Sequence, residues 1–138
     1  MSGNKIQALR KLMQQHHIQA YLIPSTDPHQ NEYLPAGWER RKWISGFTGS
    51  AGELAVTYKK AGLWTDSRYF LQAEQQLKGS SIKLFKTGVP GTPSIMEWLK
   101  SELKAGEKVG IDPQLISYQE FQKLDAYLKS WKIQLTAV

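Results

Sequence analysis

The chain has 138 residues, of which 41% are hydrophobic and 22% charged, as is typical of one soluble globular domain. The absence of cysteine excludes disulfide frameworks, zinc fingers and cysteine nucleophiles, and no apolar run is long enough for a secretory signal or a membrane span. The net charge of +6 comes from 18 Lys and Arg that are scattered along the chain, so we expect a cytoplasmic protein that binds neither nucleic acid nor membrane.

The N-terminal segment predicts an amphipathic helix followed by a strand. Asn4 is the expected N-cap, and His16 and His17 fall at the C-terminal end, where a cation favours the negative end of the helix dipole. The apolar residues with helical spacing form the expected buried face: Ile6, Leu9, Leu12 and Met13. Residues 18–23 are a short apolar run, which predicts a strand that ends before Pro24.

A long polar segment follows this strand. Residues 25–43 are rich in turn formers, and the element expected there is a short helix over residues 38–45. Residues 46–52 contain three glycines and are expected to form a loop. Two apolar runs, residues 53–58 and 63–65, flank a short turn and predict a β-hairpin.

Helices and strands alternate after the hairpin. Asp66 or Ser67 is expected to cap a helix over residues 68–77, and Thr92 followed by Pro93 predicts the start of a second helix. The apolar stripes of the two helices are expected to face the core: Tyr69, Ala73 and Leu77 in the first, and Ile95, Met96, Leu99 and Leu103 in the second.

The C-terminal segment predicts one more helix. Ser117 and Glu120 have the spacing of a capping box at its start. Its expected buried stripe is Phe121, Leu124 and Leu128. Further strands are expected at residues 82–86, 109–111 and 133–138. Five or six strands that alternate with four helices predict a single-domain α/β fold.

The sequence lacks the motifs of self-sufficient catalysis. It has three histidines, two of them adjacent, and no HExxH, GxSxG, Walker A or GxGxxG pattern. A metal hydrolase needs several converging His, Asp or Glu ligands. The sequence therefore gives no support for catalysis by this chain alone.

The first polar segment of interest is residues 24–33, which follow the first strand. It brings His29, Glu32 and Tyr33 into one loop, and ligands of α/β sheets gather beyond the carboxyl ends of strands. An equally weighted alternative is structural, with Asp27 capping a turn and His29 paired with a carboxylate.

A second segment, residues 40–52, combines Arg40 and Arg41 with a glycine-rich loop that contains Ser50. Free backbone amides in such a loop, with Arg nearby, can hold an anion or a carboxylate. The alternative is a bent connection between a helix and a strand.

The third segment runs from Trp64 to Phe70 and is expected to be mainly structural. Asp66 at a helix start is favourable for dipole reasons alone. Arg68 is expected to pair with Asp66 or Glu32, and Trp64 and Phe70 are expected to fill the core.

Taken in order, these segments resemble the start of the three-domain cytosolic Xaa-Pro aminopeptidases, the aminopeptidase P family. The motifs are Ile-Pro-Ser, Asp-x-His-x-x-Glu-Tyr, Arg-Arg-x-x-x-Ser-Gly-Phe-x-Gly-Ser-Ala-Gly and Trp-Thr-Asp-x-Arg-Tyr-Phe, with Val-Gly-Ile-Asp-Pro at residues 109–113. The resemblance covers residues 6–138, and four motifs in the right order are far more specific than any one alone.

The resemblance implies a creatinase-type N-terminal domain over residues 1–138, with a mixed sheet flanked by helices of the creatinase N-terminal or ribonuclease H-like type. It places the middle domain and the catalytic pita-bread domain, with its two manganese ions, outside this chain. The full protein would then release an N-terminal residue that precedes proline, and this chain alone would be inactive.

The resemblance also implies partners and a role for the polar loops. The expected partners are the protein's own middle and C-terminal domains and the Xaa-Pro peptide substrate, and a homodimer is compatible with it. By their position, the candidates for the wall of the substrate cleft are His29, Glu32, Tyr33, Arg40, Arg41 and Ser50, whereas Asp66 and Arg68 are carried as a structural pair.

Two other functions stay open from the sequence. One is a free-standing α/β module that binds a peptide or protein partner. The other is a nucleic-acid enzyme of the ribonuclease H-like type, which needs three or four converging carboxylates for two metal ions. Asp66 and Asp112 could lie near strand ends, but no close cluster of acids accompanies them.

Overall fold

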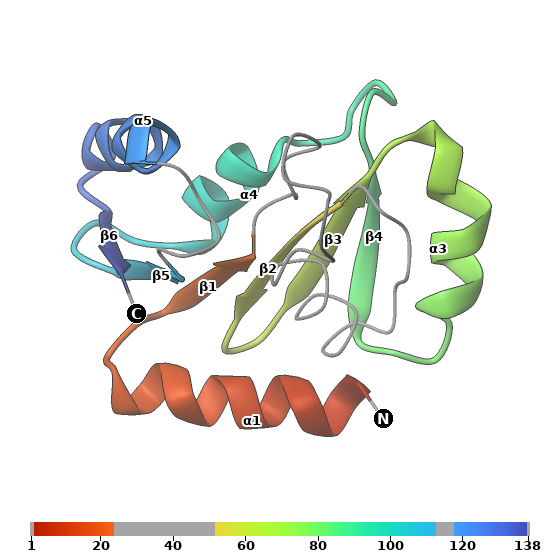
Figure 1. Ribbon diagram of the computed structural model, residues 1–138, viewed down its shortest axis with the longest axis horizontal. Helices are drawn as coiled ribbons and strands as arrows, with labels where there is room; N and C mark the ends of the chain where they lie inside the picture. The colour runs from red at the N-terminus through yellow and green to blue at the C-terminus, as the bar shows by residue number, and fades with distance from the viewer. Residues whose placement is uncertain (1, 24–51, 113–117, 138) are drawn as a thin grey trace.

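The computed structural model describes residues 2–23, 52–112 and 118–137 of the chain (Figure 1). Its elements in chain order are α1 (Ser2–Gln15), β1 (Ala20–Ile23), β2 (Glu53–Thr57), β3 (Ala61–Thr65), the 3₁₀ turn η2 (Ser67–Tyr69), α3 (Phe70–Gln76), β4 (Ile82–Lys86), α4 (Ile95–Glu102), β5 (Lys108–Ile111), α5 (Tyr118–Lys129) and β6 (Gln134–Ala137).

The strands form one mixed sheet in the order β4-β3-β2-β1-β5-β6. The pairs β1–β2 and β2–β3 are antiparallel, and the other three pairs are parallel. The expected hairpin is β2–β3, in which Glu53 lies opposite Trp64. The predicted α/β fold with a mixed sheet of five or six strands is therefore confirmed.

Both faces of the sheet are covered by helices. The core on one face includes buried side chains of α4 and α5, and the core on the other face includes buried side chains of α1 and α3 (Figure 1). The central strand β2 alternates between them, because Ala55 joins the α4 side while Leu54 and Val56 join the α1 side. Burial on two faces explains why these strands read as nearly continuous apolar runs.

Helix α1 differs from the expectation in two respects. It begins at Ser2, so Asn4 lies inside the helix and the prediction of an Asn4 N-cap is wrong. Ile6 and Met13 are fully buried, but the Leu12 side chain is 53% exposed, against the prediction. Leu12 is six residues after Ile6, which at about 100° per residue places it roughly a third of a turn away from the buried stripe.

The end of α1 is closed by the backbone. His17 has a positive φ of 58°, the Ile18 amide donates to the Met13 carbonyl at 3.0 Å, and the His17 amide donates to the Gln14 carbonyl at 3.2 Å. This is the Schellman arrangement, in which a left-handed residue satisfies the last carbonyls of a helix.

Helix α4 begins two residues later than predicted. Ser94, and not Thr92, is its N-cap, because the Glu97 amide donates to Ser94 Oγ at 3.1 Å and the Ser94 amide donates to Glu97 Oε1 at 3.0 Å. A capping box requires Glu or Gln three residues after the cap. Ser94 has Glu97 at that place, whereas Thr92 has Ile95, so Pro93 precedes the helix instead of opening it.

The remaining elements agree with the sequence within two residues, and β4 matches its predicted bounds. Asp66 caps the 3₁₀ turn, with α3 directly after it. Ala73, Leu77, Leu99, Leu103 and Leu128 are buried as expected, and Tyr69, Met96, Phe121 and Leu124 are partly buried against the cores. The predicted helix over residues 38–45 and the Ser117 cap lie outside the described residues.

Candidate functional site

Five strands end at the same edge of the sheet. All strands except β2 run in the same direction: β1, β3, β4, β5 and β6. Strand β2 runs in the opposite direction. The first five therefore end where β2 begins, and we call this side of the sheet the carboxyl edge. Ligands of open α/β sheets usually bind beyond such an edge.

The predicted cleft residues belong to a segment that is anchored at the carboxyl edge. Residues 24–52 connect the last residue of β1 to the first residue of β2, and Ile23 is paired with Leu54 in the sheet. The segment thus leaves and re-enters this edge on neighbouring strands. The candidates themselves lie outside the described residues: His29, Glu32, Tyr33, Arg40, Arg41 and Ser50.

Asp66 and Arg68 lie together at the carboxyl edge, directly after β3. Arg68 Nε donates to Asp66 Oδ1 at 3.0 Å and Arg68 Nη2 donates to Asp66 Oδ2 at 2.8 Å, while the Arg68 amide also donates to Oδ1 at 3.0 Å. These hydrogen bonds from Arg68 lower the pKa of Asp66, and Asp66 in turn raises the pKa of Arg68. Of the two partners expected for Arg68, Asp66 is confirmed, and Glu32 lies outside the described residues.

This ion pair is exposed, with 68% of the Arg68 side chain and 39% of the Asp66 side chain accessible. Exposed pairs contribute little to stability because water screens them. Its clearest local effect is therefore geometric: Asp66 holds the start of η2, while the Arg68 guanidinium lies 5.2 Å from the Tyr69 ring centroid. Trp64, as expected, is in the core, whereas Phe70, also expected there, is half-buried and belongs to neither core cluster.

Two further acids lie at the carboxyl edge. Glu53 is half-buried at the start of β2, and burial, followed by the charge of Glu120, raises its pKa. Asp112 is 8% exposed and follows β5. The sequence analysis did not select Glu53. It could have been found because it is an acid at the first position of an otherwise apolar strand, next to a glycine-rich loop.

These acids do not gather into a metal site. Asp66 follows β3 and Asp112 follows β5, and three strand spacings of about 4.8 Å separate these strands, or roughly 14 Å. Within residues 2–23, 52–112 and 118–137, no group of three or more His, Cys, Asp or Glu is placed to hold a metal ion. The described acids therefore do not supply the carboxylate cluster that a two-metal nuclease needs.

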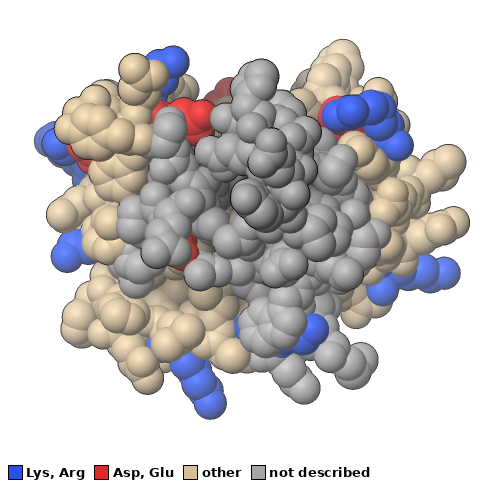
Figure 2. Space-filling model, in the orientation of Figure 1, with Lys and Arg blue, Asp and Glu red and all other residues tan. Residues whose placement is uncertain are grey.

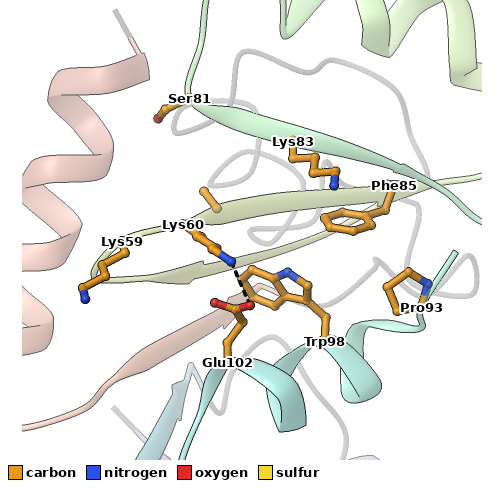
Figure 3. A pocket seen from close by; sticks show the side chains of 9 residues that line it. Lys59, Lys60, Ser81, Lys83, Phe85, Pro93, Trp98 and Glu102 are labelled. Carbon is orange, nitrogen blue, oxygen red and sulfur yellow. Dashed lines mark hydrogen bonds and ion pairs between the residues drawn. The ribbon is translucent and has the colours of Figure 1, made fainter.

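A pocket of about 440 Å³ opens on the α4 side of the sheet (Figure 3). It lies toward the end of the sheet opposite the carboxyl edge, between the β2–β3 turn, β4 and α4. Its lining consists of Lys59, Lys60, Ala61, Ser81, Lys83, Phe85, Pro93, Trp98 and Glu102. Sequence reasoning missed it, because its residues come from segments up to 43 positions apart, counted from Lys59 to Glu102.

The described surface shows no concentration of basic residues on the face in Figure 2, where Lys and Arg side chains project at separate places around the rim. Among the described residues, no helix is long and apolar enough to cross a membrane.

Comparisons with known proteins give one consistent family. The model of the Creatinase/Prolidase N-terminal domain matches residues 5–136. The chain is 47% identical to human Xaa-Pro aminopeptidase 2 over 131 residues, which are 95% of this chain and 19% of that protein. It is 49% identical to Aminopeptidase P2 of Arabidopsis thaliana over 122 residues, 87% of this chain and 17% of that protein. The chain thus spans about a fifth of the length of the curated relatives it matches.

Solved structures agree. One of them is the X-prolyl aminopeptidase of Caenorhabditis elegans, described as a cytosolic enzyme with a di-nuclear active site. The match covers all of this chain and 24% of the Caenorhabditis elegans chain, with a TM-score of 0.87 and 37% identity. The N-terminal domain of a metallopeptidase from Corynebacterium diphtheriae matches 99% of this chain and 95% of its own with a TM-score of 0.69. At 20% identity, the second match supports the fold alone.

Proposed function

The chain belongs to the Creatinase/Prolidase N-terminal domain family, and we propose from this that it is the non-catalytic N-terminal domain of a cytoplasmic, metal-dependent Xaa-Pro aminopeptidase. One observation carries the proposal: identity of 44–49% to Xaa-Pro aminopeptidases extends over most of this chain but over only about a fifth of theirs. The domain then spans residues 1–138, and the middle and catalytic pita-bread domains belong to the rest of the protein.

The chemistry of the described residues fits a supporting role. They contain no cluster of three or more potential metal ligands. The two manganese ions that we expect are assigned by this proposal to the catalytic domain. That centre would supply an activated water for hydrolysis. The cytosolic description of the Caenorhabditis elegans enzyme supports the same compartment here.

The carboxyl edge supports a role as part of the substrate cleft wall. The polar segment of residues 24–52 is tied to this edge at both ends, and it carries the six candidate cleft residues. Packing against the protein's own middle and C-terminal domains would turn this edge toward the Xaa-Pro peptide. Association of two subunits is compatible with the same arrangement.

The test compares the protein of the complete reading frame with the 138-residue chain. Each is assayed on a tripeptide with proline in second place and on its alanine counterpart, with manganese and with a chelator. We expect the complete protein to release the first residue from the proline peptide alone, the chelator to stop this, and the 138-residue chain to release nothing. Cleavage by the short chain would contradict the non-catalytic assignment, and no cleavage by the complete protein would contradict the peptidase assignment.

A further inference from the structure

We draw no further inference here: the strongest candidate, the aromatic surface patch where the exposed Tyr127 of α5 meets the ring of Trp131 beside Lys100 of α4, carries none because nothing in the described part of the structure shows what covers it.

Discussion

Glu53 lies in an environment that opposes its charge. Burial, and then the charge of Glu120, raise its pKa above the ordinary value of 4.5. A carboxyl group with a raised folded-state pKa holds its proton more tightly in the folded chain than in the unfolded chain. The free energy of unfolding therefore falls as the pH rises from about 4.5 through the folded pKa.

Glu53→Gln removes this decline, because an amide does not ionise. We expect the variant to be more stable than the original chain at about pH 7 and nearly equal to it at about pH 4, as measured by urea unfolding at both pH values. The control Glu74→Gln makes the same change at an exposed residue of α3 that pairs with Lys86 Nζ at 2.6 Å, so it should give no gain in stability at about pH 7. An equal gain at both pH values would show that the effect does not come from ionisation of Glu53.

Gly62 leaves room for the stacked rings of Trp64 and Phe85, whose centroids lie 4.3 Å apart. A methyl group at this position would lie 2.7 Å from Phe85 Cε2 and 2.8 Å from two atoms of the Trp64 ring, so the stacked rings would have to move. We expect Gly62→Ala to lower the free energy of unfolding by about 1–3 kcal/mol, the usual cost of overpacking. Leu71→Ala, at a side chain 76% exposed, should change it by less than about 0.5 kcal/mol in the same urea titration. Equal stability of Gly62→Ala and the original chain would show that the Trp64 and Phe85 rings can move apart without cost.

Among the elements, the strands could be predicted better than the helix ends. The central strands β2 and β3 are buried on both faces, and this leaves a dense local signal such as Leu54 to Val56. A helix start depends on which of several polar residues forms capping hydrogen bonds with the residue three positions later. Thr92-Pro93 looked like the start of α4 because proline is common at the first helical position, yet the Glu97 side chain selects Ser94.

This difference predicts the outcome of two matched substitutions. Ser94→Ala removes the hydroxyl that accepts from the Glu97 amide, one of the two hydrogen bonds of the capping box, and should cost about 1 kcal/mol of unfolding free energy. Thr92→Ala, two residues earlier, should cost less than about 0.5 kcal/mol because Thr92 is not the cap. Thermal or urea unfolding of the two variants side by side measures the difference, and the reverse order of stabilities would restore the Thr92 cap.

Across the whole molecule, the sequence singles out one candidate region, residues 24–52, and misses the pocket beside α4. The polar segment between β1 and β2 could be selected as a candidate site because its polar and charged residues are close together in the sequence. Ligands also gather beyond strand ends, where this segment begins. The pocket beside α4 depends on strand order: Lys60 and Lys83 line it together because β3 and β4 pair in parallel, and Glu102 reaches Lys60 because α4 covers that face. No local pattern contains this information.

The carboxyl edge also sets the last prediction, which concerns the complete protein and rests on the proposed function. If the segment of residues 24–52 forms part of the cleft wall, Arg41 can hold a substrate carboxylate or carbonyl through charge-assisted hydrogen bonds. Arg41→Ala should then lower kcat/KM on an Xaa-Pro peptide by about tenfold, the equivalent of losing one such bond. Lys78→Ala removes the same charge from an exposed residue between α3 and β4, toward the opposite end of the sheet, and should leave kcat/KM unchanged. Steady-state kinetics of the two variants decide the matter: unchanged kinetics for Arg41→Ala would remove Arg41 from the cleft, whereas equal losses in both would point to the overall charge of the domain.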